Sequence, residues 1–183
     1  MLRVIGGEAR GRKLAVLKGR ATRPTTDRVR ESLFNILGEK VIGAEVLDLF
    51  AGAGSLGIEA LSRGAGKAVF VDRKSGCART IRRNLETLGF KERAEVYEQE
   101  TNKAIKFLAR RGRKFGLIFL DPPYRSDLAE GALQELTSSN IIDDGAIVVI
   151  EHHRKRVIPE KVGSLKLVRE EQYGDTKLSF YGS

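Results

Sequence analysis

The sequence contains a single cysteine and no long apolar segment. Because Cys77 stands alone among 183 residues, no disulfide can form within the chain. Disulfides are rare in cytosolic proteins, so a lone thiol agrees with that location. No apolar run reaches the roughly 20 residues that a membrane-spanning helix needs, and the N-terminus lacks the apolar core of a signal peptide. We therefore expect a cytoplasmic protein without membrane contact.

Acidic residues are scarce in the first 30 positions. Nine basic and two acidic residues there give a charge of +7 (nine minus two), out of a formal +9 for the whole chain. A localised basic segment is typical of a protein that binds a polyanion. Aromatic residues are nearly absent from the same segment, which favours contact with phosphates over stacking on bases. The sequence therefore predicts phosphate contacts by three residues of this segment: Arg10, Arg12 and Lys13.

The basic segment also has an ordered pattern. Apolar residues at 2, 4 and 5 precede Gly6-Gly7, and four more follow at 14–17. This pattern predicts a small β-hairpin extension over residues 1–22, followed by one domain over residues 23–183. A solvated tail is the alternative for the extension. Hydrophobic residues make up 41% of the chain, enough for one sizeable core.

Apolar runs and helical patterns alternate from residue 44 onward. Nearly continuous apolar strands between helices are typical of a parallel sheet that is covered on both faces. The last two strands are separated only by Gly174-Asp175, which predicts an antiparallel hairpin at the edge of the sheet. We therefore expect an α/β, Rossmann-like fold with a mostly parallel, seven-stranded sheet. The expected strands are 46–50, 68–72, 94–97, 115–120, 146–150, 165–173 and 177–181. The expected helices include one that Thr25 or Thr26 caps and Gly38 ends, and the segments 55–62, 101–111 and 127–138.

Three carboxylates fall near the ends of expected strands. Asp48 lies near the end of the first strand, Asp72 ends the second and Asp121 follows the fourth. Because all parallel strands end at one edge, these side chains should lie along the carboxyl edge, where open α/β sheets bind ligands. Each alone is more simply a helix cap or a surface acid, but three at one edge indicate a site.

A GxGxxG pattern, Gly52 to Gly57, follows the first strand, and Asp72 lies 20 residues after Gly52. Glycines allow a close approach of the backbone to a ligand at a helix N-terminus. The pattern alone fits NAD, but in dinucleotide folds the first glycine follows the apolar strand almost directly, whereas here Asp48 interrupts the strand and Phe50-Ala51 intervene. A sulfonium cofactor with an amino-acid tail needs polar partners of this kind.

The DPPY segment, residues 121–124, follows the fourth strand and suits methyl transfer to an exocyclic amine. The lone pair of such an amine is delocalised into the base. The Asp121 carboxylate and the Pro122 carbonyl could accept both amino hydrogens and release that lone pair, while two prolines keep the acceptors preorganised. Tyr124 offers a flat face for a base turned out of its stack. The predicted catalytic residues are Asp121, Pro122, Pro123 and Tyr124.

With these motifs the chain resembles the class I, S-adenosylmethionine-dependent amino-group methyltransferases. More narrowly, it resembles the bacterial 16S ribosomal RNA guanine-N2 methyltransferases (RsmD-like). The matching stretches are RVIGGEARGRKL (3–14), RPTTDRVRESLFNIL (23–37), DLFAGAGSLGIEALSRGA (48–65), DPPY (121–124) and YGDTKLSFY (173–181). DPPY is shared with DNA methyltransferases, whereas the arginine-threonine stretch is much more specific to the family.

The resemblance implies that S-adenosyl-L-methionine is the cofactor and that a guanine N2 in 16S rRNA, within the 30S subunit or its assembly intermediate, is the acceptor. It implies a monomer. The stretch from Arg23 to Arg30 would close over the cofactor and meet RNA through Arg23, Thr25, Thr26, Arg28 and Arg30. Related enzymes often place an Asp near the adenine after the third strand, and here Glu100 takes that position. The cofactor-binding residues are then Asp48, Phe50, Gly52, Gly54, Asp72, Arg73, Glu100 and Thr101.

Three other functions are alternatives. The first is a DNA amino-methyltransferase, which would normally carry a larger target-recognition region. The second, less favoured, is an NAD oxidoreductase, and the third is a non-catalytic RNA-binding assembly factor, which would not need an intact DPPY segment. His152-His153 have no cysteine or acid cluster at ligand spacing, so no metal site is predicted. Cys77 falls on the apolar face of its expected helix, which indicates a core position.

Overall fold

The computed structural model describes residues 1–17, 26–123 and 127–183. Strands and helices alternate along most of the chain, as the sequence predicts. The helices are α1 (Asp27–Leu37), α2 (Ser55–Ser62), α3 (Ser75–Leu88), α4 (Thr101–Arg110) and α5 (Leu128–Ser138), with short 3-10 turns at Gly38–Val41 and Lys91–Arg93. The strands are β1 (Glu45–Leu49), β2 (Lys67–Asp72), β3 (Ala94–Glu98), β4 (Phe115–Leu120), β5 (Ile142–His153), β6 (Lys161–Val162), β7 (Leu165–Tyr173) and β8 (Thr176–Gly182).

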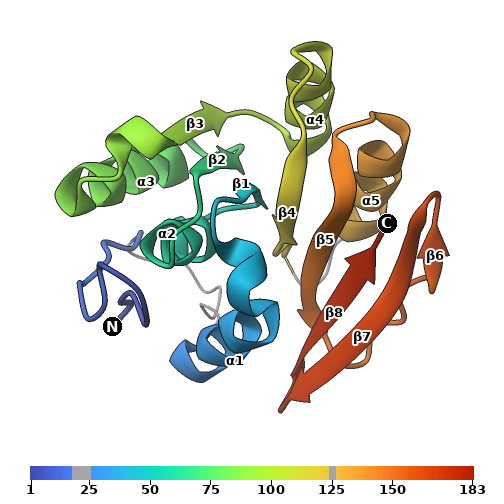
Figure 1. Ribbon diagram of the computed structural model, residues 1–183, viewed down its shortest axis with the longest axis horizontal. Helices are drawn as coiled ribbons and strands as arrows, with labels where there is room; N and C mark the ends of the chain where they lie inside the picture. Colours follow the sequence, from blue (N-terminus) through green and yellow to red (C-terminus); the bar gives the residue numbers. More distant parts are fainter. Residues whose placement is uncertain (18–25, 124–126) are drawn as a thin grey trace.

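All these strands form one sheet in the order β3-β2-β1-β4-β5-β8-β7-β6 (Figure 1). The first five strands are parallel, whereas β8 runs antiparallel between β5 and β7, so the expected C-terminal hairpin is confirmed. The described residues contain eight strands and not the expected seven. The extra strand, β6, has two residues and pairs with the start of β7. β5 is also longer than expected at both ends, because the exposed residues 143–145 and the polar residues 151–153 break the apolar pattern.

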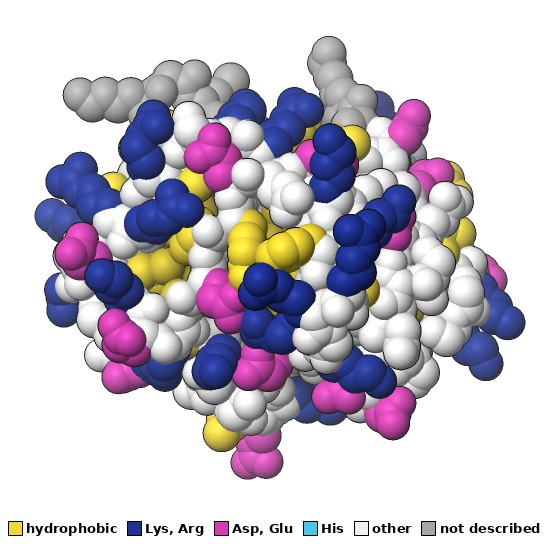
Figure 2. Space-filling view, turned by 90° about the horizontal axis from the view of Figure 1, so that it is seen from above, with side chains coloured by type: hydrophobic (Ala, Val, Ile, Leu, Met, Phe, Trp, Pro, Cys, Tyr) yellow, Lys and Arg dark blue, Asp and Glu magenta, His cyan; other side chains and the backbone are white. Residues whose placement is uncertain are grey.

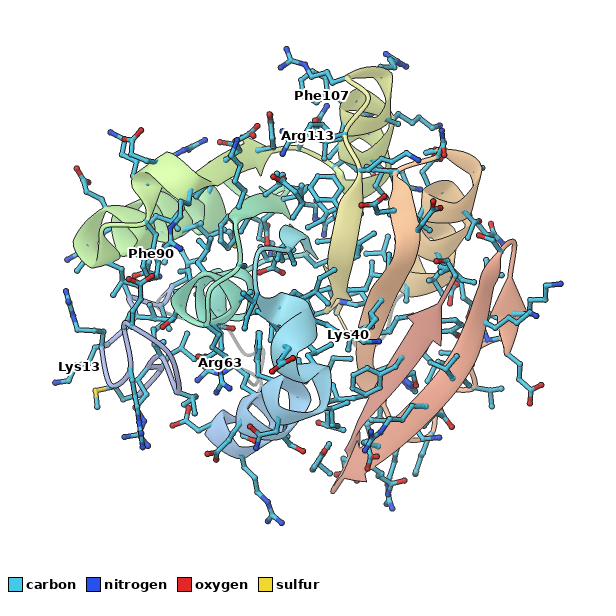
Figure 3. The ribbon with its side chains drawn as sticks, in the orientation of Figure 1. Lys13, Lys40, Arg63, Phe90, Phe107 and Arg113 are labelled. Atoms are coloured by element: carbon cyan, nitrogen blue, oxygen red, sulfur yellow. The ribbon has the colours of Figure 1, made fainter. Side chains whose placement is uncertain are left out.

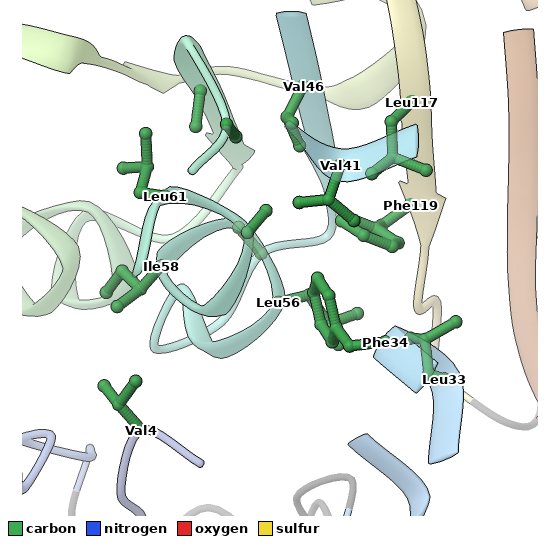
Figure 4. Close-up of a cluster of buried hydrophobic side chains, with 14 of the residues drawn as sticks. Val4, Leu33, Phe34, Val41, Val46, Leu56, Ile58, Leu61, Leu117 and Phe119 are labelled. Carbon is green, nitrogen blue, oxygen red and sulfur yellow. The ribbon is translucent and has the colours of Figure 1, made fainter. Parts of the chain in front are cut away.

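Helices cover both faces of the sheet (Figure 1). Alternate residues of β1 show the division: Val46 joins the core beneath α1, α2 and α3, whereas Leu47 and Leu49 join the core beneath α4 and α5. In the first core, the ring centroids of Phe34 and Phe119 lie 5.8 Å apart, and Figure 4 shows the two side chains. Burial on both faces explains why the strands read as continuous apolar runs.

Helix α1 begins and ends as its sequence predicts. Thr26 Oγ1 accepts a hydrogen bond from Val29 N at 3.3 Å, so Thr26 is the N-cap of the helix. Gly38 terminates it with a φ of 53°, which a residue with a side chain rarely adopts. Val29, Leu33 and Phe34 are buried against the sheet, so the helix is fixed to the domain by its apolar face.

Residues 1–17 form an antiparallel loop that is fixed to the domain, which we call the arm. The backbone pairs Val4 N with Arg12 O and Leu14 N with Leu2 O, both at 2.9 Å, but the arm forms one isolated bridge and no regular strand pair. The ladder ends because the amides of Ile5 and Gly6 each donate to the Glu59 carboxylate, at 2.8 Å. Val4 packs near Ile58 of α2 (Figure 4), and the arm shares the core of the domain.

No helix in residues 1–17, 26–123 or 127–183 combines the length and apolar character needed to cross a bilayer.

Candidate active site at the carboxyl edge of the sheet

The three predicted carboxylates belong to neighbouring strands. In the sheet β1 lies between β2 and β4, and Leu49 is in register with Val71 on one side and Leu120 on the other. Asp72 and Asp121 directly follow those two partners, so they flank the end of β1 at the carboxyl edge. Asp48 lies one residue earlier. The structure therefore brings the glycine loop and the segment that begins at Asp121 to adjacent strand ends.

Asp48 holds the start of α2. The side chain is 1% exposed, and its Oδ2 accepts a hydrogen bond from Gly57 N at 2.9 Å. Burial raises the pKa of Asp48 to about 7, the Gly57 amide opposes this shift, and the charge of Asp72 adds to it. Gly57 is required for close packing, because a Cβ there would lie 2.4 Å from the ring of Phe70. Asp48 is thus both a candidate ligand group and a buried anchor of the loop.

Asp72 closes the glycine loop from the next strand. Its Oδ2 accepts from Gly52 N and its Oδ1 accepts from Lys74 N, both at 2.9 Å. Each carboxylate oxygen has a second lone pair, so Asp72 can still accept from a ligand hydroxyl. Gly54 is the N-cap of α2 with a φ of 81°, in the left-handed region that glycine tolerates.

Phe50 has the most unusual backbone conformation in the loop. Its φ is 62°, and the only other described non-glycine residue with a positive φ is Asn140, a type that tolerates this region. A bulky residue held there costs on the order of 1–3 kcal/mol, and such strain clusters at functional sites. Ala51 N donates to Val71 O at 3.0 Å, so the chain rejoins the sheet immediately after the strained residue.

The predicted adenine contact, Glu100, is the N-cap of α4. Its carboxylate oxygens accept from Asn102 N at 3.1 Å and Lys103 N at 3.2 Å, and Thr101 is buried as the first residue of the helix. Arg73 is exposed at the start of the β2–α3 connection. The Glu100 carboxylate therefore caps α4, a structural task that the sequence did not predict. A bond to the cofactor would use the same two carboxylate oxygens.

The acceptor segment after β4 is described up to Pro123. Asp121 N donates to Leu49 O at 3.4 Å, which ties the segment to the end of β1. Asp121 is half-buried, Pro122 is buried and Pro123 is exposed. Tyr124 lies outside the described residues. The segment thus begins directly beside the strand that leads into the glycine loop.

Glu151 is a carboxylate that the sequence analysis missed. Leu120 is in register with Ile150 of β5, so Glu151 is the neighbour of Asp121 on the next strand. Val149 belongs to the first core, and the period of two within β5 therefore places the side chain of Glu151 on the same face. Glu151 is 4% exposed. The carboxyl-edge rule points to Glu151 only when β5 extends past residue 150, and the expected strand ended there.

Asn84 is a second missed residue, and it connects the glycine loop with the arm. Its Nδ2 donates to Ala53 O and to Ala15 O, both at 3.1 Å, and its Oδ1 accepts from Ala15 N at 2.8 Å. The side chain is 3% exposed. One buried amide thus uses three hydrogen bonds to join two segments that are far apart in the sequence.

The predicted RNA contacts have different environments. Five of them are exposed: Arg10, Arg12, Lys13, Thr26 and Arg28. Arg23 and Thr25 lie outside the described residues. Arg30 is 0% exposed, and its Nη2 donates to Arg3 O at 2.7 Å and Asp27 Oδ1 at 2.8 Å. Placing Arg30 among the RNA contacts was wrong, because the arm covers its guanidinium and gives it a structural task.

Cys77 and His152 both lie in the interior of the protein. Cys77 is 0% exposed, so its predicted core position is confirmed. His152 is buried, with its Nε2 2.8 Å from Ser179 Oγ, and burial lowers its pKa. His152 therefore belongs to a polar contact between β5 and β8.

Comparison with known proteins identifies the family. The family model described as "Conserved hypothetical protein 95" matches residues 2–182. YlbH of Bacillus subtilis strain 168 is 42% identical over 180 residues, which cover 98% of each chain. Ribosomal RNA small subunit methyltransferase D of Escherichia coli strain K12 is 37% identical over 180 residues, which cover 98% of this chain and 89% of that protein. The chain belongs to the RsmD-like methyltransferase family.

Solved structures agree with this membership. The structure of yhhF from Escherichia coli superimposes with a TM-score of 0.83 at 37% identity, covering 99% of this chain and 97% of that one. A Thermus thermophilus 16S rRNA N2 G1207 methyltransferase, RsmC, in complex with AdoMet and guanosine, gives a TM-score of 0.73 at 21% identity and covers 92% of this chain and 45% of that one. The second likeness shows the fold alone. The class I methyltransferase fold and the RsmD-like resemblance predicted from the sequence are thus confirmed.

Proposed function

We propose that this RsmD-like protein transfers a methyl group from S-adenosyl-L-methionine to the exocyclic N2 of a guanine in 16S ribosomal RNA. The observation that carries the proposal is the placement of Asp121 and the glycine loop at adjacent strand ends. A donor held at the loop and an amine held at Asp121 would then be neighbours. The family supports the substrate class, since its relatives include enzymes named for methylation of small-subunit rRNA.

The residues at the edge fit this cofactor chemically. Asp48 and Asp72 are carboxylates that can accept from the ammonium group and the ribose hydroxyls, and a loop with Gly52 and Gly54 leaves the backbone accessible. The bound cofactor supplies an electrophilic methyl group on a sulfonium. The chain has therefore only to position the acceptor, because no further activation of the donor is needed.

Asp121 and Pro122 act on the acceptor amine. The carboxylate and the carbonyl accept one amino hydrogen each, which draws the lone pair out of the base and toward the methyl carbon. On methylation the amine would lose one proton, and the Asp121 carboxylate is the nearest proposed acceptor for it. Preorganised acceptors at a developing charge are worth roughly 10² to 10³ in rate.

The substrate form is part of the proposal. The target would be presented by the 30S subunit or an assembly intermediate, and the enzyme would act as a monomer in the cytoplasm, as the sequence analysis expects. The exposed arm residues Arg10, Arg12 and Lys13 would contact RNA phosphates. Tyr124 would hold the flipped base by stacking.

The test uses 30S particles from cells that lack this activity. The protein is incubated with S-adenosylmethionine carrying a labelled methyl group, and the labelled nucleotide is mapped. We expect one labelled guanine in 16S rRNA with the methyl group on N2. Label in duplex DNA and none in rRNA would favour the DNA amino-methyltransferase, and binding to particles without any transfer would favour the assembly factor.

A further inference from the structure

The arm lies along α3, which continues the basic surface of the arm. Three contacts follow each other along both segments. Arg12 Nη2 donates to Thr87 O at 3.0 Å near the end of α3, Ala15 binds Asn84 one turn earlier, and a Cβ at Gly76 in the first turn would lie 2.9 Å from Leu17 Cδ2. Residues 12–17 therefore run antiparallel to α3, so their exposed side chains border its outer face.

The outer face of α3 is basic. Its buried side carries Cys77, Ile81 and Leu85, and the residues at helical spacing on the other side include Arg79 and Arg83. Between residues 73 and 87 five exposed basic side chains accompany one exposed acid. Figure 2 shows Lys and Arg side chains gathered on the left of the molecule, the side on which α3 lies in Figure 1.

These basic side chains are not neutralised within the part of the chain that the structure describes. Arg79 and Arg83 form no ion pair there, and neither do Arg12 and Lys13. Some arginines outside this surface are neutralised; Arg113, for example, pairs with both Glu45 and Glu95. Unpaired positive charges that line one surface retain their attraction for a polyanion.

We propose that the outer face of α3 and the arm form one continuous phosphate-binding surface for ribosomal RNA. Its principal residues are Arg12, Lys13, Arg79, Arg82 and Arg83. Figure 3 shows Lys13 pointing away from the protein on the same side as Phe90, which follows α3. A helix of 14 residues spans roughly 21 Å, so the surface extends well beyond the arm. It starts close to Asp72, because α3 follows β2 after two residues.

This surface explains how a small enzyme holds a large RNA. The proposal rests on the proposed function, because it takes ribosomal RNA as the polyanion. Phosphate contacts fix the register and orientation of a nucleic acid without reading its bases. The α3 face would therefore bind the RNA that flanks the target nucleotide, while the edge beside Asp121 acts on the base.

The test replaces Arg79 and Arg83 together. Arg82 is left in place because its Nη2 also donates to Val96 O at 3.0 Å. Binding of the full-length variant to a 16S rRNA transcript and to 30S particles is measured over a range of salt concentrations. Each lost phosphate contact reduces the slope of log affinity against log salt by about 1. For R79A/R83A we therefore expect a slope lower by about 2, and RNA affinity lower by about tenfold near 0.1 M salt.

Two matched variants complete the experiment. R79K/R83K keeps the charges and should retain most of the affinity and the slope. K161A/K166A removes two exposed charges from β6 and β7, at the opposite end of the sheet from α3, and should leave RNA binding unchanged. An R79A/R83A protein with normal affinity and slope would overturn the proposed surface, and so would an equal loss in K161A/K166A. A wild type that binds RNA through α3 but transfers no methyl group would instead contradict the proposed function.

Discussion

The glycine loop after β1 and the acceptor segment after β4 leave the same edge of the sheet but are held in different ways. Side chains from three elements fix the glycine loop: Asp48 binds Gly57 N, Asp72 binds Gly52 N, and Asn84 binds Ala53 O. The described start of the acceptor segment has a backbone bond from Asp121 to Leu49 and two prolines. Side chains of neighbouring elements thus shape the first loop, and two prolines stiffen the backbone of the second.

This difference matches the proposed tasks. A loop that holds a cofactor benefits from many fixed contacts, because they set the position of the donor before RNA arrives. An acceptor segment needs oxygens that remain available to the incoming amine, and prolines provide stiffness without using any acceptor. Substitutions on the two sides should therefore fail in different ways: on the glycine-loop side in cofactor binding, and on the acceptor side in the chemical step.

The largest effect is expected from Asp121→Asn. Asn keeps the shape and one acceptor oxygen but loses the negative charge, so the amine is less well stabilised as it becomes tetrahedral. Single-turnover transfer of labelled methyl to 30S particles should fall by roughly 10²-fold or more. Cofactor and RNA affinity should stay within about twofold of wild type, since no uniform binding contact is removed. Near-normal transfer by a folded D121N protein would place the chemistry elsewhere.

Asp72→Ala should affect the glycine loop and should weaken cofactor binding. It removes the acceptor for Gly52 N and for Lys74 N together with a predicted ribose contact. Leaving such groups without a partner costs about 1–3 kcal/mol, or about 5- to 150-fold in S-adenosylmethionine affinity by calorimetry. At saturating cofactor, the rate of transfer should recover to a larger extent than in D121N. If D72A binds the cofactor normally and is defective only in the rate of transfer, the two loops do not differ in the step that they serve.

Asp48 makes the glycine-loop side sensitive to pH. Its pKa of about 7 lies above the value of about 4 for an unfolded aspartate. Between these values the folded protein keeps a proton that the unfolded chain has lost, so the free energy of unfolding falls as the pH rises from about 4 to about 7. Asp48→Asn keeps an acceptor for Gly57 N but cannot ionise.

Thermal unfolding of wild type and D48N at pH 5 and pH 8 tests this linkage. Other groups titrate in both proteins, so the quantity to compare is the difference between their melting temperatures at each pH. The melting temperature of D48N minus that of wild type should be several degrees higher at pH 8 than at pH 5, since 1 kcal/mol corresponds to about 2–4 °C for a chain of this size. Parallel pH profiles would mean that Asp48 is ionised in the folded protein over this range.

Much of this comparison could be predicted from the sequence. The order of strands and helices along the chain could be predicted, because both faces of the sheet are buried and its strands therefore appear as continuous apolar runs between helical patterns. The position of Asp72 and Asp121 at the carboxyl edge could be predicted because a strand end is a local feature, visible as an apolar run that stops at an acid. The carboxyl edge then follows from the parallel direction of the strands alone.

The contacts that hold the arm could not be predicted in this way. Glu59, Ser62 and Asn84 read as ordinary polar residues of helices, and their partners lie more than 50 positions away in the sequence. Arg30 was misassigned for the same reason, since only the folded arm places Arg3 O above its guanidinium. Local periodicity shows which face of a helix is apolar, but not which backbone covers its polar face.

The smallest effect is expected where the glycine loop meets the arm. Asn84→Ala removes the donor to Ala53 O and both bonds to Ala15, so the loop loses one of its three side-chain contacts. A net hydrogen bond is worth about 0.5–1.5 kcal/mol, so S-adenosylmethionine affinity should fall by about 2- to 12-fold. Ser62→Ala is the matched control, because Ser62 Oγ bonds to Ala9 N and Gly6 O and holds the arm at α2, away from the glycine loop. It should lower RNA affinity and leave cofactor affinity unchanged. If both variants lower cofactor affinity equally, the arm as a whole supports the glycine loop. If neither variant lowers it, the Asn84 contact only fixes the arm.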